Sequence, residues 1–478
     1  MTCTMLIGRK EETRKLLKAH ESEYSQFVTV YGRRRVGKTF FVREAFKYKF
    51  TFEHTGMNKT GMAGQLESWA VSMRSFGYFV DTPKNWIEAF EQLTNLILAS
   101  KERKKVVFID EMPWMDTPKS GFISALEHFW NGWASARKDI TLIVCGSVTS
   151  WIMNKLIRNK GGLRGRVTTR IRIKPFTLAE CEKYNTANKL GLSKKQIAEC
   201  AMIMGGIPFY WSFLDREKSL AQNIDYLFFN EDGELYGEFD ELYASIFKKP
   251  EAYIDVITKL GTKKVGMTRE ELTSSGIREN GKLTKILKDL EECGFIRKYN
   301  AFGYAKKNAI FQLIDPFTLF YFKFMNNNRI GDERFWSHSQ SSPTYNNWCG
   351  LAFERLCFAH INQIKQALGI TGVISGVCSW QVKATKERKG AQIDLLIDRD
   401  DNVIDICEMK YTKDPFYITA DYEENLQSKR SRFIEDTCTD KATHLVMISA
   451  AGVVSNSYAG ELQKVITLDD LFADYNEL

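Results

Sequence analysis

The residues near the N-terminus that are best suited to chemistry form a basic loop, Gly32-Arg33-Arg34-Arg35-Val36-Gly37-Lys38-Thr39. It follows a β-rich run and precedes a helical one, the context in which G-x-x-x-x-G-K-[ST] binds phosphate. Backbone N–H groups would surround the phosphates, Lys38 would reach their oxygens and assist catalysis, and the Thr39 hydroxyl would coordinate Mg²⁺. We predict a nucleotide site lined by Gly32, Arg33, Arg34, Arg35, Val36, Gly37, Lys38, Thr39 and Phe40.

Two carboxylates follow a second apolar run, Val106–Ile109, as Asp110 and Glu111. Open α/β sheets bind ligands at the carboxyl ends of their strands. We therefore expect Asp110 to hold Mg²⁺ through water and Glu111 to act as the catalytic group that polarises the attacking water.

A third apolar run, Ile140–Val144, precedes Ser147. Ser147 would sense the γ-phosphate or, alternatively, cap a helix that begins near Val148. Further on, Arg164 and Arg166 lie in a glycine-rich loop. Either could be an arginine finger at the nucleotide, and we assign Arg166 to that site, whereas a solvated basic loop is the alternative.

A second group of chemical residues lies near the C-terminus, in two strand-like runs. Glu408 and Lys410 are two residues apart in one run and therefore share a face, and strand pairing would bring Asp394 beside them. Carboxylates with a lysine can perform metal-assisted phosphodiester hydrolysis, with Asp394 and Glu408 as metal ligands and all three residues catalytic. A non-catalytic surface cluster is the alternative, since the D…E-x-K pattern is loose.

Short apolar runs separated by helical segments predict an α/β fold whose parallel sheet is covered on both faces. The pattern turns helical after Pro175, then shows a helix followed by a hairpin, as in a winged helix-turn-helix, and ends in a second α/β region. We expect a nucleotide-binding core, a helical lid, a winged helix, a linker and a nuclease-like domain, at residues 1–174, 175–238, 239–325, 326–346 and 347–478.

The winged-helix interpretation makes about Asn280–Cys293 the recognition helix. Its outward residues could contact DNA, together with two lysines on the wing. Acidic neighbours dilute this charge, so a protein-interaction or spacer role stays open. The helix residues concerned are Lys282, Thr284, Lys285 and Lys288, and those of the wing are Lys306 and Lys307.

Composition bounds the class of protein. The 478 residues carry 67 Lys+Arg against 59 Asp+Glu, and the 10 cysteines include no CxxC pair. A disordered or disulfide-stapled chain is excluded. Met1–Glu12 lacks the apolar core of a signal peptide, and no 18-residue stretch is continuously apolar, so we expect a cytoplasmic protein without a membrane partner. The net charge of +8 permits nucleic acid as a partner.

Several motifs occur in a familiar order over the first half: Gly8-Arg9, GRRRVGKT at 32–39, FIDEMPWM at 108–115, CGSVTSW at 145–151, RIRIKPF at 170–176 and GGIPFY at 205–210. With them the chain resembles AAA-like P-loop ATPases of the archaeal-ATPase family, also found in bacteria. The resemblance implies binding and hydrolysis of ATP with Mg²⁺, a helical lid, and Gly8 and Arg9 near the adenine. A homo-oligomer is compatible with it.

The C-terminal region looks like the PD-(D/E)xK nuclease core, which often follows such an ATPase. The resemblance adds Glu354 as a further metal-binding acid and Gln427 as a supporting residue, although Ile393 stands where the motif has Pro. The resulting hypothesis is an ATPase whose nucleotide state regulates or drives a nuclease-like domain acting on DNA, with RNA left open. The alternative is an ATP-dependent switch or scaffold whose last domain binds nucleic acid or protein without cutting.

Overall fold

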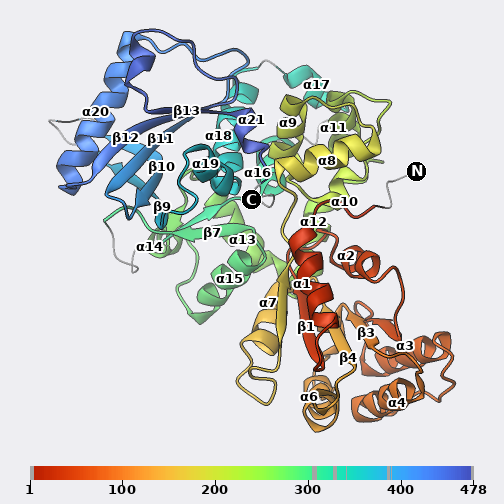
Figure 1. Ribbon diagram of the computed structural model, residues 1–478. Helices are drawn as coiled ribbons and strands as arrows, with labels where there is room; N and C mark the ends of the chain where they lie inside the picture. The colour runs from red at the N-terminus through yellow and green to blue at the C-terminus, as the bar shows by residue number, and fades with distance from the viewer. Residues whose placement is uncertain are drawn as a thin grey trace. The chain divides into compact units, whose positions relative to one another are not determined.

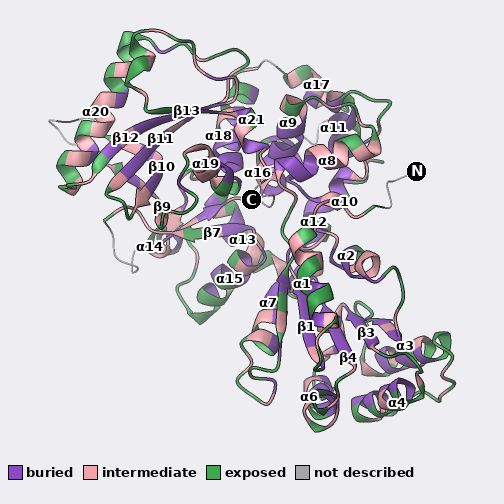
Figure 2. Cartoon of the chain, in the orientation of Figure 1, coloured by how far each residue is buried: buried purple, intermediate pink, exposed green. Residues whose placement is uncertain are grey.

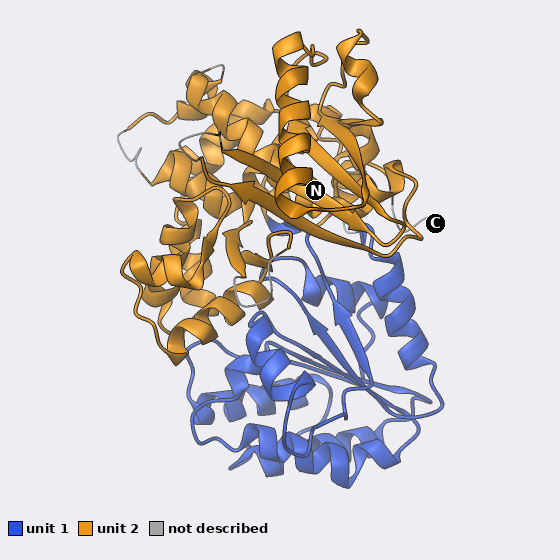
Figure 3. Cartoon of the chain, turned by 90° about the vertical axis from the view of Figure 1, so that its left-hand side faces the viewer, with its two compact units in different colours: residues 1–175, 207–209 blue, residues 176–206, 210–478 orange. Residues whose placement is uncertain are grey.

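The computed structural model describes residues 5–303, 309–326, 331–340, 342–384, 388 and 390–474. The chain divides into two compact units, residues 1–175 with 207–209, and residues 176–206 with 210–478 (Figure 3). It therefore passes between them at three points, 175–176, 206–207 and 209–210. Among the described residues, no helix combines the length and apolar character needed to cross a membrane.

A five-stranded sheet forms the centre of the first unit (Figure 1), with strand order β2-β3-β4-β1-β5. Every neighbouring pair is parallel, which confirms the predicted parallel sheet. Strands β3 and β4 are buried along their whole length because helices cover them, as their uninterrupted apolar runs predicted. The strands are β1 (Gln26–Tyr31), β2 (Phe52–Thr55), β3 (Lys105–Asp110), β4 (Ile140–Cys145) and β5 (Thr169–Arg172).

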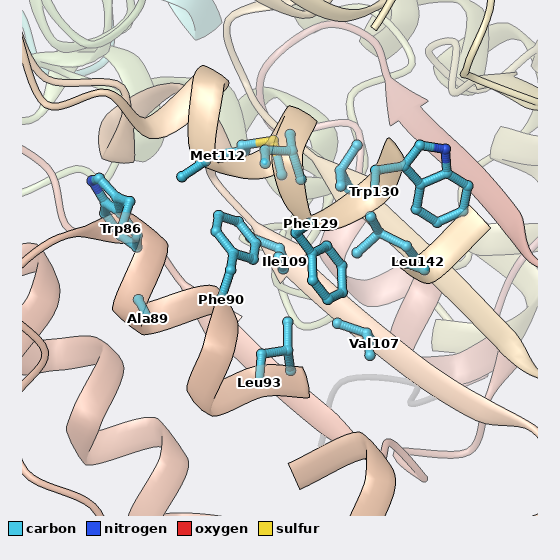
Figure 4. Packing of buried hydrophobic residues seen from close by; sticks show 14 of the residues in the cluster. Trp86, Ala89, Phe90, Leu93, Val107, Ile109, Met112, Phe129, Trp130 and Leu142 are labelled. Carbon is cyan, nitrogen blue, oxygen red and sulfur yellow. The ribbon is translucent and has the colours of Figure 1, made fainter. Parts of the chain in front are cut away.

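Amphipathic helices fix this sheet through a large aromatic core (Figure 4). The side chain of Asn85 caps the helix α4, and Trp86, Phe90 and Leu93 follow at helical spacing on its buried face. Full burial of a side chain such as Phe90 contributes about 1.5–3 kcal/mol. The helices are α1 (Lys10–His20), α2 (Lys38–Ala45), α3 (Met62–Ser75), α4 (Trp86–Ala99), α5 (Met112–Met115), α6 (Phe122–Gly132) and α7 (Thr149–Ile152).

The second unit begins with the helices expected after residue 175. Three of them start with a capping box, at Thr177, Ser193 and Ser219, so each start is fixed locally. The predicted break at Gly205 is confirmed as the C-cap of α9. The elements are α8 (Leu178–Asn188), α9 (Lys194–Met204), α10 (Pro208–Trp211), α11 (Leu220–Phe229) and α12 (Glu238–Ile246).

Residues 250–313, here called the middle module, contain helix, strand, two helices and two strands in that order. The antiparallel sheet has the order β6-β8-β7. Helix α15 confirms the predicted helix and buries Leu283, Leu287 and Leu290. Lys306 and Lys307 lie outside the described residues. The elements are α13 (Pro250–Gly261), β6 (Met267–Thr268), α14 (Arg269–Ser274), α15 (Gly281–Glu292), β7 (Ile296–Tyr299) and β8 (Ile310–Leu313).

The stretch 326–346, predicted to be a linker, holds packed helix instead in its described part. After α16 (Pro316–Phe320), helix α17 (Phe335–Ser339) buries Trp336 completely. The Trp336 ring contacts Phe320 at 5.2 Å, and its backbone N–H donates to Asp225. One large aromatic side chain thus anchors a segment whose composition is otherwise polar.

The last region is a five-stranded mixed sheet with strand order β13-β12-β11-β10-β9. Strand β10 is antiparallel to both neighbours, and a β-bulge interrupts it between Ile393 and Leu396. In Figure 2 the strands of this sheet are largely buried and α20 exposes one side. The elements are α18 (Pro343–Ala359), α19 (Ile361–Ala367), β9 (Ser375–Val382), β10 (Ala391–Arg399), β11 (Val403–Lys410), α20 (Ala420–Thr437), β12 (Ala442–Ser449), β13 (Lys464–Thr467) and α21 (Leu468–Leu471).

Candidate functional site

The basic loop connects the end of β1 to the start of α2, and its two glycines serve different purposes. Gly37 is the N-cap of α2 with φ 83°, a left-handed conformation that favours glycine. A Cβ on Gly32 would lie 2.1 Å from the carbonyl oxygen of Ile173, so the loop can approach this backbone only without a side chain. The two glycines thus let the loop turn directly into the N-terminus of α2, whose free N–H groups can bind phosphate.

The Lys38 side chain is buried inside this loop. Its ammonium donates hydrogen bonds to the carbonyl oxygens of Gly32, at 3.1 Å, and Arg33, at 2.9 Å. The loop thereby holds a positive charge where phosphate oxygens would bind. Arg33 and Val36 are also buried, Arg34 and Arg35 are half-buried, and Phe40 is exposed.

Thr39 and Asp110 meet across the carboxyl edge of the sheet. The Thr39 hydroxyl donates a 2.5 Å hydrogen bond to Oδ2 of Asp110. The two strands that lead to them, β1 and β3, are separated only by β4. A hydroxyl oxygen and a carboxylate oxygen this close are the donor types that Mg²⁺ prefers, so these residues fit the predicted metal.

Glu111 and Ser147 form a second contact at the same edge. Oε2 of Glu111 accepts hydrogen bonds from the Ser147 backbone N–H, at 3.0 Å, and from its hydroxyl, at 2.8 Å. Helix α7 begins at Thr149 with Val148 as its N-cap, so the alternative role of Ser147 as a helix cap is wrong. Glu111 has φ 45°, and its N–H donates to Asp110, which fixes its direction.

Two further residues contact the loop, and the sequence analysis predicted no role for either. The Thr149 hydroxyl donates to the carbonyl oxygen of Gly32 at 3.0 Å. The guanidinium of Arg35 lies over the Phe209 ring, 4.4 Å from its centroid. Both residues belong to motifs already recognised, CGSVTSW and GGIPFY, which is the signal that could have identified them.

Gly8 and Arg9 lie at the start of α1. The guanidinium of Arg9 donates to the carbonyl oxygen of Lys174 at 2.7 Å, and the preceding residue, Ile173, is the one that touches Gly32. The start of α1 is therefore tied to the backbone beside the loop, while the role of Gly8 and Arg9 toward adenine stays a prediction. Arg164 and Arg166 are exposed.

In the C-terminal region, Glu354 and Asp394 converge on one cation. The ammonium of Lys264 lies 2.8 Å from Oε1 of Glu354 and 3.2 Å from Oδ2 of Asp394. The other Asp394 oxygen accepts a hydrogen bond from Gln392 at 2.5 Å. Burial, with the nearby charge of Asp394, raises the pKa of Glu354.

Glu408 and Lys410 lie together elsewhere, against α20. Glu408 accepts a hydrogen bond from the Tyr422 hydroxyl at 3.1 Å and forms ion pairs with Lys429 at 3.1 Å and Lys410 at 3.4 Å. The Lys410 ammonium also lies 5.1 Å from the centre of the Tyr422 ring. Gln427 contacts Glu461 instead.

The prediction that strand pairing brings the side chain of Asp394 beside Glu408 and Lys410 is therefore wrong, and the bulge in β10 is the reason. Ile393 and Leu396 both pack in the cluster that contains residues of α20, so Asp394 between them turns to the other face. Glu408 follows Ile406 by two residues and stays on the α20 face. Among the described residues, no group of three or more acidic, His or Cys side chains could hold a metal ion.

Comparison with known proteins gives one match to a family model. Residues 6–212 match the model of an ATPase domain predominantly from Archaea. Together with the P-loop geometry, this match supports ATP binding and ATP hydrolysis. The matched range covers the P-loop, Asp110, Glu111 and Ser147 and ends before the middle module.

Similar proteins are known at low identity. "Uncharacterized protein MJECL04" of Methanocaldococcus jannaschii is 23% identical over 411 residues, which are 83% of this chain and 85% of that protein. The Walker-type ATPase PABY2304 of Pyrococcus abyssi has 19% identity and a TM-score of 0.45, with 66% of this chain and 95% of that chain covered. The ORC2 protein of Aeropyrum pernix, in ADPNP–ADP complexes, has 12% identity and a TM-score of 0.41, with 66% and 92% covered.

Proposed function

We propose that this chain hydrolyses ATP with Mg²⁺ at the P-loop site, defined as Gly32–Thr39 with Asp110, Glu111 and Ser147. The observation that carries the proposal is the contact of Thr39 with Asp110 beside the buried ammonium of Lys38. A bound Mg²⁺ would neutralise charge on the phosphate oxygens. Lys38 and the loop N–H groups orient the phosphates, and Glu111 accepts a hydrogen bond from the attacking water.

The Ser147 hydroxyl would respond to the presence of the γ-phosphate. In the structure it donates both its N–H and its hydroxyl to Glu111. With a γ-phosphate bound, the hydroxyl has a competing acceptor, and Glu111 is freed to bind water. An arginine finger, Arg164 or Arg166, would act from its exposed loop on a neighbouring copy.

For the C-terminal region we propose metal-dependent cleavage of a nucleic acid, with DNA as the expected substrate. Glu354 and Asp394 already share one cation, which supports a metal site at this pair. The middle module follows the element order of a winged helix, and Lys282, Thr284, Lys285 and Lys288 are exposed on α15, where they can contact phosphates.

A second candidate is a nucleotide-dependent switch whose C-terminal region binds without cutting. The separation of Glu408 and Lys410 from Asp394 favours it, since a cutting site needs these groups around one phosphate. The two candidates differ in one observable, the cleavage of a phosphodiester bond.

Nucleotide state can reach the C-terminal region through α8 and α9, which follow the first unit directly in the chain. The N–H of Leu178, at the start of α8, donates to buried His360 at 2.9 Å. The Tyr345 hydroxyl on α18 donates to Glu199 on α9 at 3.0 Å. Lys194 pairs with Asp469 on α21 at 2.8 Å. A shift of these helices on ATP binding would therefore move α18, which carries Glu354.

The test is a plasmid-cleavage assay with Mg²⁺ or Mn²⁺ and ATP. The nuclease proposal expects cutting by the parent and its loss in Asp394→Ala and Glu354→Ala, which remove the two carboxylates of the proposed metal site. Asp398→Ala is the matched control, because Asp398 lies further along the same strand and pairs with Lys441. Absence of cutting under all conditions, or normal cutting by both variants, would leave the switch as the function.

A further inference from the structure

We infer that Lys264 is a built-in cation that occupies the metal position of the Glu354–Asp394 pair, so that a divalent ion binds there only when Lys264 withdraws. The inference rests on the proposed metal site and adds its regulation by the middle module. Lys264 lies in that module, between the end of α13 at Gly261 and the start of β6 at Met267.

The ammonium of Lys264 bridges two carboxylates from different elements, Glu354 on α18 and Asp394 on β10. A bridging cation with one oxygen from each carboxylate is also how a small divalent ion is bound. The same oxygens cannot serve both cations at once. Occupancy by Lys264 and occupancy by a metal therefore exclude each other.

The backbone of Lys264 is held as firmly as its side chain. Its carbonyl oxygen accepts hydrogen bonds from Gln312 on β8, at 2.7 Å, and from the buried guanidinium of Arg355. Arg355 directly follows Glu354, so one turn of α18 contacts both the carbonyl oxygen and the ammonium of Lys264. An exposed surface ion pair loses much of its energy to side-chain entropy, whereas this lysine is already fixed in place.

The second oxygen of Glu354 also points to a ligand stronger than an ammonium. Glu354 is 8% exposed, and its Oε2 atom is buried without a hydrogen-bond partner among the described residues. A buried carboxylate oxygen left unpaired is costly, and a divalent ion can satisfy it by binding both oxygens.

The middle module also contacts β9, α20 and α18 of the C-terminal region. Phe302 donates its backbone N–H to Ser379 on β9 at 2.8 Å, and its ring packs on Phe433 at 5.1 Å. The guanidinium of Arg297 lies 3.5 Å from the centre of the Phe358 ring. We therefore expect that Lys264 leaves the two carboxylates when the middle module shifts and these contacts change. The middle module would then control access of a divalent ion to the Glu354–Asp394 pair.

The loss of metal affinity depends on how often Lys264 occupies the Glu354–Asp394 pair. If Lys264 is withdrawn in about 1–10% of molecules, the apparent affinity of the pair for a divalent ion is weakened about 10- to 100-fold. Removal of the lysine charge should raise the affinity by the same factor without any change in the metal ligands.

The experiment measures Mn²⁺ binding to the full chain without nucleotide, by electron paramagnetic resonance, in the parent and in Lys264→Met. The variant should bind Mn²⁺ about 10- to 100-fold more tightly. The control is Lys263→Met, whose lysine pairs with Glu271 away from the carboxylates, and it should bind as the parent does. Binding that survives Asp394→Asn belongs to the P-loop site and is subtracted.

Hydrogen exchange supplies a readout that needs no reaction. Amides of residues 265–268 should exchange faster in Lys264→Met and in the Mn²⁺-saturated parent than in the metal-free parent. Equal Mn²⁺ affinity in the parent and Lys264→Met, with binding lost in Asp394→Asn, would overturn the inference and leave the metal site standing. If Lys264→Met binds no Mn²⁺ that depends on Asp394, the metal site fails and the inference with it.

Discussion

The hydroxyl of Thr39 donates a 2.5 Å hydrogen bond to the carboxylate of Asp110, although 71 residues separate them in the chain. The parallel sheet creates this contact, because β1 and β3 end at the same edge with β4 between them. The fold alone thus brings together two oxygen atoms of the type that Mg²⁺ prefers.

Asp110→Asn should weaken the Mg²⁺ dependence of ATP turnover. An amide oxygen carries no charge, so the Mg²⁺ concentration for half-maximal turnover should rise at least about 10-fold, equivalent to ~1.4 kcal/mol. Titration of Mg²⁺ at fixed ATP measures this shift. Asp81→Asn, at an exposed aspartate, is the control, and an identical shift in both variants would contradict the assignment.

Ser147→Ala should slow ATP turnover while ATP binding is kept. The variant removes the hydroxyl that donates to Glu111 in the structure and that, in the proposed reaction, donates to the γ-phosphate instead. A hydrogen bond to a charged group contributes about 1.5–3 kcal/mol, so loss of the bond to the γ-phosphate should slow turnover about 10- to 100-fold. Steady-state hydrolysis and equilibrium binding of a fluorescent nucleotide separate the two effects. Unchanged turnover would exclude this role of the Ser147 hydroxyl at the γ-phosphate.

Gly32→Ala should abolish nucleotide binding, whereas Gly37→Ala should retain it. The new Cβ of Gly32→Ala would meet the Ile173 carbonyl at 2.1 Å, so the loop must move and nucleotide binding should be lost. Gly37→Ala meets nothing within 4 Å and costs only the left-handed backbone strain, about 1–2 kcal/mol. The upward shift of the melting temperature by ATP should vanish in the first and persist in the second. Equal behaviour of the two variants would contradict this distinction.

Asp139 should stabilise the first unit in a pH-dependent way. A hydrogen bond from Arg137, with help from Lys105, lowers the pKa of Asp139 from 3.8 to about 2. Because the folded-state pKa is the lower one, the stabilisation is complete above pH ~4 and is lost as the pH falls toward 2. Asp139→Asn should cost about 1–2 kcal/mol in urea unfolding at pH 7, after allowance for partial exposure, and less at pH 3. A cost that does not change with pH would refute this origin.

The first half of the chain could be predicted because the residues suited to chemistry lie close together in short sequence motifs. A loop, a strand and the two carboxylates that follow it specify their own geometry, so the meeting of the loop and the carboxylates at one edge of the sheet could be predicted. The roles of Lys38, Thr39 and Asp110 toward ATP and Mg²⁺ stay predictions. Strands β2 and β5 escaped prediction, since each has only four residues and partly exposed positions that carry no clear pattern.

The C-terminal region was harder because one residue changes the face of a strand. Strand pairing predicted Asp394 beside Glu408, whereas the bulge in β10 turns Asp394 toward Lys264, which also contacts Glu354 on α18. The contact of Lys264 with Asp394 spans 130 residues, and no local pattern predicts such a pairing. The packed Trp336 was hidden in the same way by the polar residues around it.

The central claim is that Glu111 activates water for ATP hydrolysis at the P-loop site, and Glu111→Gln tests it most directly. Single-turnover hydrolysis of ATP, with nucleotide affinity measured on the same sample, should show parent-like ATP binding and a 10²- to 10⁴-fold slower chemical step. Parent-like hydrolysis by Glu111→Gln, with Lys38→Ala also active, would contradict the claim.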